Sequence, residues 1–257
     1  MLRIFLFALF LYPFYIDYSF PQEEEENVKL GEFSITGTTT DIFGSQNAEN
    51  YSKIIRPDEK VTWNVYIPNN YNPVKPAGVM LYFMSSKPNK IISSWKAGSD
   101  ERNLIWISLA NFDNYTNEQK MFLGVISLSL LQSEYQINTG RIYASGDSLG
   151  CVHASNAAQV YPNIISGAIY MNCRPQIWKK NKPPEGIEYM KKNHYVFVTS
   201  NRNESRIDVR LARNRYTDSG IKNTLLETHS TLTEDVRLSS SKVLELIDYL
   251  DSDTSEE

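Results

Sequence analysis

The sequence predicts an α/β fold with a mainly parallel central sheet and helices on both faces. Short, continuously apolar runs such as Gly78–Met84 have the length and composition of buried parallel strands. In the second half of the chain such runs alternate with helical segments, and this alternation implies right-handed crossover connections. A length of 257 residues suits one large domain or two small ones, and no internal repeat marks a second domain.

The chain opens with an apolar segment. Arg3 precedes the run Ile4–Ile16, which is short for a membrane span and suits the h-region of a secretory signal. Because a small-x-small cleavage site is missing, an uncleaved membrane tether stays open. We assign residues 1–22 to a signal peptide or N-terminal tether and expect a secreted or periplasmic protein.

Acidic segments bound the expected domain. Residues 23–27 contain four consecutive glutamates and are interpreted as an acidic linker, and residues 251–257 as a mobile acidic tail. The α/β domain is therefore expected over residues 28–250. The formal net charge of -4 gives no reason to expect nucleic acid or an anionic membrane as partner, so membrane contact is expected only through an uncleaved N-terminal segment. The oligomeric state is not predicted.

The first half of the domain is expected to supply three strands and a helix. Val61–Pro68 alternates large apolar and polar residues, which predicts a strand near a sheet edge. Gly78–Met84 and Asn103–Leu109 are apolar throughout and predict central strands. Between Asn117 and Tyr135 apolar residues recur at helical spacing, which predicts a crossover helix.

The second half is expected to alternate strands with helices. The predicted strands and helices are, in chain order, the strand Arg141–Ser145, a helix near Val152–Val160, the strands Ser166–Met171 and His194–Ser200, a helix near Ile207–Asp218, the strand Asn223–His229 and a helix near Ser240–Leu250. In sheets of this class ligands bind beyond the carboxyl ends of the strands.

A Gly-x-Ser-x-Gly motif lies between a predicted strand and a predicted helix, at Gly146–Gly150. Such a motif arises by chance in roughly one chain in ten of this length, so its context carries the prediction. Its glycines permit a tight strand-to-helix bend that exposes Ser148 at the start of the helix. There the helix dipole and the N–H of Leu149 can stabilise an oxyanion. The alternative is an ordinary turn serine.

A serine nucleophile needs a histidine base at the same sheet edge. The chain has three histidines. His229 closes the last predicted strand and follows the serine in the chain, so we predict that it is the base, with a surface histidine as the alternative. His153 lies about one turn beyond the serine on the same helix and is interpreted as a packing or surface residue. His194 precedes a strand and lies at the wrong end of the sheet.

The chain resembles α/β-hydrolase-fold proteins, above all secreted esterases of the polyhydroxybutyrate-depolymerase and feruloyl-esterase type. The resemblance covers about Val61–Leu250 and is most specific around the motif, over Tyr135–Cys173. It implies a serine ester hydrolase that works through an acyl-enzyme. Ser148 would be the nucleophile, His229 the general base and then the acid, and the N–H of Leu149 one oxyanion donor.

The sequence departs from this family in the oxyanion loop. After the strand Gly78–Met84 the esterases carry His-Gly, and an N–H of that loop completes the oxyanion hole. This chain has Ser85 and Ser86 there, and a backbone N–H of either, Ser85 first, is the expected donor. Losing one such donor costs about 10²–10³ in rate.

The second departure concerns the acid of the triad. Asn203 occupies the place where the family has an aspartate. Asparagine can orient a histidine but cannot stabilise the imidazolium by charge. Glu204 is therefore our candidate acid, Asp208 on the following helix is a poorer one, and Asp147 beside the serine is interpreted as a local turn residue.

These departures keep other functions open. The first alternative is a catalytically impaired α/β-hydrolase-fold protein with a binding or structural role. The second is an adhesin or carbohydrate-binding module, which would need an exposed row of aromatic side chains. The four tryptophans are spread along the chain, and Trp106 lies inside a predicted strand, so most are expected in the core or a lid.

The remaining signals concern cysteines, cofactors and substrate. Cys151 and Cys173 are the only cysteines and allow one disulfide, with two buried thiols as the alternative. Neither metal-ligand spacing nor a phosphate-binding loop is present, so no metal or cofactor is expected. The basic connection Cys173–Asn193 is interpreted as a lid or as an ordinary solvated loop. The substrate is expected to be a small or polymeric ester: short acyl esters, plant phenolic esters and polyesters all remain candidates.

Three Asn-x-Ser/Thr sequons, at Asn50, Asn114 and Asn203, matter only in a eukaryotic secretory pathway. A glycan on Asn203 would lie on the proposed acid loop and would argue against catalysis.

Overall fold

The computed structural model describes residues 28–84, 90–230 and 237–252. These residues form one eight-stranded sheet with the strand order β1-β2-β4-β3-β5-β6-β7-β8. β1 and β2 pair antiparallel, as do β2 and β4, and all other neighbours are parallel. The strands are β1 Gly31–Gly37, β2 Val61–Ile67, β3 Ala77–Phe83, β4 Leu104–Leu109, β5 Ile137–Asp147, β6 Gly167–Met171, β7 His194–Ser200 and β8 Thr224–His229.

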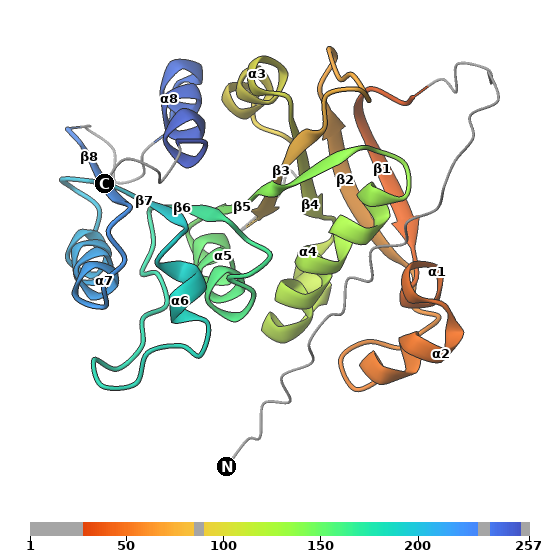
Figure 1. Ribbon diagram of the computed structural model, residues 1–257, viewed down its shortest axis with the longest axis horizontal. Coiled ribbons are helices and arrows are strands. Elements are labelled where there is room, and N and C mark those ends of the chain that lie inside the picture. Colours follow the sequence, from red (N-terminus) through yellow and green to blue (C-terminus); the bar gives the residue numbers. More distant parts are fainter. Residues whose placement is uncertain (1–27, 85–89, 231–236, 253–257) are drawn as a thin grey trace.

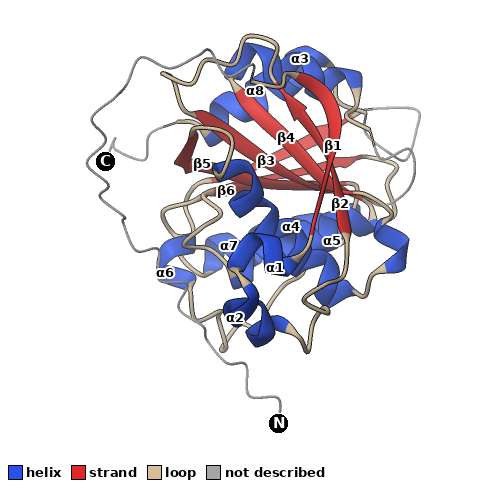
Figure 2. Cartoon of the chain, turned by 90° about the vertical axis from the view of Figure 1, so that its right-hand side faces the viewer, coloured by secondary structure: helices blue, strands red, loops and turns tan. Residues whose placement is uncertain are grey.

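Helices cover both faces of the sheet (Figures 1 and 2). One face carries α3 and α8, and the other carries α4, α5 and α7. The bounds are α3 Ser93–Arg102, α4 Asn117–Gln132, α5 Leu149–Val160, α7 Arg206–Asp218 and α8 Ser240–Leu250, with short helices α1 Thr39–Phe43, α2 Ser45–Ala48 and α6 Ile187–Met190. The predicted fold class, a mainly parallel sheet between two helical layers, is confirmed.

The two faces of the sheet bury separate apolar cores. On the side of α4, α5 and α7 the core runs from β2 to β7, and on the other side a smaller core packs against α3 and α8. β3 and β4 are buried along their whole length, as expected for central strands covered on both faces. The four tryptophans are all buried, and therefore form no exposed aromatic row.

β1, α1, α2, α3 and α6 were not predicted from the sequence. Helix α3 lacks an apolar stripe because its inward positions include Gly98 and Ser99 beside Trp95. Gly98 is required by the contact with α8, since a Cβ there would lie 2.8 Å from Val243 Cγ1. The helix is therefore set by its close approach to α8, which helical periodicity does not reveal.

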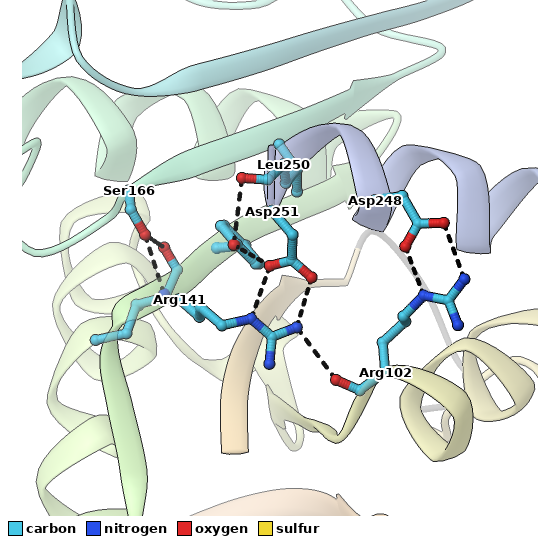
Figure 3. Close-up of polar contacts among 8 residues, drawn as sticks. Arg102, Arg141, Ser166, Asp248, Leu250 and Asp251 are labelled. Carbon is cyan, nitrogen blue, oxygen red and sulfur yellow. Dashed lines mark hydrogen bonds and ion pairs between the residues drawn. The ribbon is translucent and has the colours of Figure 1, made fainter. Parts of the chain in front are cut away.

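Two arginine pairs fasten α8 to the rest of the domain (Figure 3). Arg141 donates to Asp251 from Nε at 2.7 Å and from Nη2 at 2.6 Å, and the Tyr143 hydroxyl donates to the same carboxylate at 2.5 Å. Arg102 of α3 donates to Asp248 at 2.5 and 2.9 Å. Asp251, the first residue of the predicted acidic tail, is thus part of the folded domain, whereas residues 253–257 and 1–27 lie outside the described residues.

The basic connection between β6 and β7 packs against α7. Trp178 is 8% exposed, its Nε1 donates to Ser219 Oγ at 3.1 Å, and its carbonyl accepts from Arg215 Nη1 at 2.6 Å. These contacts fix the middle of the connection to the helical layer and favour the ordinary-connection interpretation over a lid. In the described residues no helix is long and apolar enough to cross a membrane.

Candidate active site

The Gly-x-Ser-x-Gly motif forms a sharp turn between β5 and α5. Ser148 has φ 51° and ψ -122°, a conformation that a residue with a side chain rarely adopts. The turn is closed by backbone packing: a Cβ on Gly146 would lie 2.4 Å from the carbonyl carbon of Gly150, and a Cβ on Gly150 would lie 1.9 Å from the carbonyl oxygen of Phe83. Only glycine fits at either position, and the result is a half-exposed serine at the start of a helix.

The start of α5 is suited to binding an anion. No side chain caps the helix, so its first N–H groups keep their electrostatic preference for negative charge. Leu149 follows the serine directly and its side chain is 66% exposed. The carboxyl end of β3 lies beside this turn, because Phe83 and Met84 are the backbone neighbours of Gly150. The second expected donor, Ser85, lies outside the described residues, as does Ser86.

Asp147 has a local role, as the sequence analysis expected. Its Oδ1 accepts a hydrogen bond from Asn172 Nδ2 at 3.0 Å. Asn172 itself has φ 51° and follows the neighbouring strand β6. Burial and, to a smaller extent, the charge of Asp147 raise the pKa of Tyr82. The carboxylate therefore joins the two turns at the ends of β5 and β6.

A disulfide bond links the turn to β6. Cys151, in the first turn of α5, is bonded to Cys173, and their Cα atoms are 6.0 Å apart. Ser148 N–H also donates to the carbonyl oxygen of Met171 at 3.2 Å. The serine turn is thereby fixed on one side to β3 and on the other side to β6.

His229 lies at the carboxyl end of β8, at the same edge of the sheet as Ser148. Its carbonyl oxygen accepts from Asn201 N–H, and its Nε2 is buried without a hydrogen-bond partner. Among the described residues no hydrogen bond joins it to Ser148. Three strand spacings, roughly 14 Å along the sheet, separate β5 from β8. The two residues therefore lie at the same edge of the sheet, at the ends of strands three places apart.

The expected acid position cannot supply a charge. Asn203 is 6% exposed, and its Oδ1 accepts from the N–H of Ser205 at 2.8 Å. Glu204 is exposed at the start of α7, and no ion pair joins it to His229 in the described residues. Asp208 is paired with Arg174 at 2.9 Å. A glycan on Asn203 would require this buried side chain to leave the fold.

One carboxylate that the sequence analysis missed does lie near the histidine. Glu227 Oε2 is 4.0 Å from His229 Nε2 and 3.7 Å from Lys242 Nζ on α8. The signal was available in the sequence, because residues two apart on a strand point to the same face. The predicted strand ending Glu-Thr-His already placed both side chains together.

Among the described residues the other two histidines form no hydrogen bond with Ser148 or His229. His153 is buried on α5 against Phe112, and burial followed by the charge of Lys120 lowers its pKa. His194 begins β7 at the opposite edge and lies 3.3 Å from Ser252 Oγ. Both agree with the sequence-based interpretation. In the parts of the chain described here, no group of His, Cys, Asp and Glu could hold a metal ion.

Comparison with known proteins identifies the fold. No family model matches the sequence. No curated protein matches it either. Among solved structures, a thermostable esterase aligns with a TM-score of 0.56 and 12% identity, over 85% of this chain and 59% of the esterase, so the chain spans less than two thirds of that protein.

Two further structures align over nearly their whole length. A fluorophosphonate-binding serine hydrolase of Staphylococcus aureus has a TM-score of 0.58 and 10% identity, and covers 87% of this chain and 100% of its own. A ferulic acid esterase has a TM-score of 0.59 and 11% identity, and the alignment covers 86% of this chain and 99% of the esterase. The chain therefore has the α/β-hydrolase fold.

Proposed function

We propose that this protein is a serine ester hydrolase in which Ser148 is the nucleophile. The observation that carries the proposal is the strained, glycine-enclosed turn that presents Ser148 at the uncapped start of α5. A turn serine without a function has no need of φ 51°, and strain of this kind is concentrated at functional sites. The similar solved structures include serine hydrolases and esterases, which supports this choice of chemistry.

The proposed reaction has two stages. Ser148 Oγ attacks the ester carbonyl carbon while His229 takes the hydroxyl proton, and the oxyanion is held by the N–H of Leu149. His229 then returns the proton to the departing alcohol, which leaves an acyl-enzyme. Water, deprotonated by the same histidine, hydrolyses the acyl-enzyme and frees Ser148. The reaction requires His229 to approach Ser148 from its place on β8.

The substrate is proposed to be a carboxylic ester, either small or polymeric. We further propose export to an oxidising compartment. The apolar run Ile4–Ile16 and the Cys151–Cys173 disulfide both support this location, because disulfides persist mainly in secreted and periplasmic proteins.

A catalytically impaired hydrolase fold is the second candidate. Two observations favour it: the uncharged Asn203 occupies the expected acid position, and among the described residues no hydrogen bond joins Ser148 to His229. Under this proposal the turn at Ser148 is kept because Gly150 packs against Phe83, and the carboxyl edge serves binding alone.

Labelling with a fluorophosphonate probe tests the two candidates. The full chain, Ser148→Ala, His229→Ala and Glu204→Gln are compared for labelling and for hydrolysis of short-chain nitrophenyl esters. If the protein is a hydrolase, the probe should label every protein except Ser148→Ala. Ester hydrolysis should be lost in Ser148→Ala and in His229→Ala, and retained in Glu204→Gln. Equal ester hydrolysis by all four folded proteins would remove the enzymatic proposal, and absence of labelling would favour the impaired fold.

A further inference from the structure

We infer that Glu227, on the same strand as His229, is the carboxylate that positions this histidine for its role as base. The inference rests on the proposed function of Ser148 and His229. It assigns the acid to β8 itself, in place of the loop that follows β7.

The loop after β7 leaves the role unfilled. Asn203 carries no charge and its Oδ1 is engaged with the N–H of Ser205. Glu204 is exposed, and Asp208 is paired with Arg174 at 2.9 Å. Among the described residues no ion pair joins Glu204 or Asp208 to His229, so neither supplies the carboxylate in this structure.

Glu227 lies where such a carboxylate is needed. Its Oε2 is 4.0 Å from His229 Nε2, and the two side chains are only 21% and 25% exposed. Nε2 is buried and makes no other hydrogen bond. Since an N–H···O hydrogen bond is about 2.9 Å long, a shift of about 1 Å by either side chain would complete it. An N–H buried at Nε2 without a partner would be costly, so the tautomer protonated at Nε2 favours this shift.

Lys242 of α8 holds the other side of this carboxylate. Its Nζ lies 3.7 Å from Glu227 Oε2 and 2.6 Å from Glu245 Oε2. Within the described ranges, the charged groups paired with the Glu227 carboxylate are His229 on its own strand and Lys242 on α8, and Glu245 pairs with the same lysine. The lysine holds the Glu227 carboxylate on the α8 side of the sheet, and its positive charge offsets part of the negative charge that faces His229.

The contact assigns different tasks to the two ring nitrogens. With Nε2 as the N–H donor to Glu227, Nδ1 is the nitrogen left to accept the proton of Ser148 Oγ. The histidine becomes an imidazolium in that step, and the negative charge of Glu227 stabilises it without taking the proton. Glu227 touches neither the substrate nor the serine, so it is a positioning residue.

Two measurements on the full chain test the inference independently of each other. The first is the NMR titration and tautomer of the His229 ring. We expect the neutral ring to carry its proton on Nε2, and the titration midpoint to move to lower pH in Glu227→Gln, because the imidazolium loses a neighbouring charge. Glu245→Gln is the matched control: it contacts the same lysine but not the histidine, and should shift His229 far less.

The second measurement is kcat/KM for a nitrophenyl ester as a function of pH. Glu227→Gln should lower kcat/KM about tenfold or more and move its acidic limb to lower pH, whereas Glu227→Asp should recover part of the loss. Lys242→Met should move the acidic limb to higher pH. If the wild-type chain hydrolyses no ester, the proposed function fails while the titration still tests the contact. An unchanged His229 titration in Glu227→Gln, or an Nδ1–H tautomer, overturns the inference whatever the activity.

Discussion

The two arginine pairs that fasten α8 differ in burial and should differ in strength. Arg141 and Asp251 are each 23% exposed, whereas Arg102 and Asp248 are 33% and 52% exposed. Both carboxylates accept two hydrogen bonds from one guanidinium, but Asp251 also accepts from the Tyr143 hydroxyl. Substituting each aspartate by asparagine therefore compares the stability contributed by two arginine–aspartate pairs of similar geometry, one less exposed to solvent than the other.

The expected costs follow from these surroundings. Exposed ion pairs contribute about 0–1 kcal/mol, and removing one partner of a fully buried pair costs about 3–5 kcal/mol. Asp248→Asn should fall in the first range, at about 0.5 kcal/mol. Asp251→Asn leaves Arg141 without its counter-charge at intermediate burial and should cost about 2 kcal/mol, which is roughly a thirtyfold change in the unfolding equilibrium.

Urea unfolding followed by tryptophan fluorescence measures the free energy of unfolding of both variants. Asp218→Asn, at an exposed position on α7, is the control substitution. Arg102 lowers the pKa of Asp248 through its hydrogen bonds, so the stability from that pair is present near neutral pH and is lost as the pH falls below about 4. Equal destabilisation by Asp251→Asn and Asp248→Asn at neutral pH would refute the argument from burial.

Three further predictions concern the serine turn and its surroundings. Gly150→Ala should abolish labelling of the serine and lower the yield of folded protein, because its Cβ cannot coexist with the Phe83 carbonyl; normal labelling of this variant would contradict the turn geometry. Replacing Cys151 and Cys173 by alanine opens a loop with a sequence separation of 22 and should cost about 3 kcal/mol in urea unfolding, with reducing agent having the same effect on the wild type and none on the variant. Burial lowers the pKa of His153, so the unfolded chain binds a proton that the native chain does not, and the free energy of unfolding should fall as the pH drops below about 6.5; in His153→Phe this part of the slope should disappear, and an unchanged slope would count against it.

The strands and helices of the domain core could be predicted because their signals are local. Apolar runs such as Gly78–Met84 and the helical spacing after Asn117 can each be recognised within a short stretch of sequence, although it is the whole fold that buries these residues. By contrast, α3 is defined by its contact with a helix more than a hundred residues away, and β1 pairs only at the edge of the sheet. Such elements are set by tertiary contacts, so their own residues carry little pattern.

The site was predictable to the extent that it depends on chain order. The turn at Ser148 could be inferred because glycine spacing and a strand-to-helix transition are both readable. His229 could be placed at the correct edge because it closes a strand. The carboxylate beside His229 was not predicted. The resemblance implies an acid in the loop after β7, where Glu204 was the candidate, whereas among the described residues Glu227, on the strand of the histidine itself, lies 4.0 Å from His229 Nε2.

The packing of Gly150 against the carbonyl oxygen of Phe83 has a consequence for how such sequences evolve. The glycine is required for the helix to rest against the neighbouring strand, so selection for a stable domain retains it even in a lineage that no longer hydrolyses anything. The motif is therefore expected to persist after the proposed reaction is lost. Under the proposed function, loss of that chemistry among relatives should therefore first become visible at His229 and Glu227 rather than at Gly150.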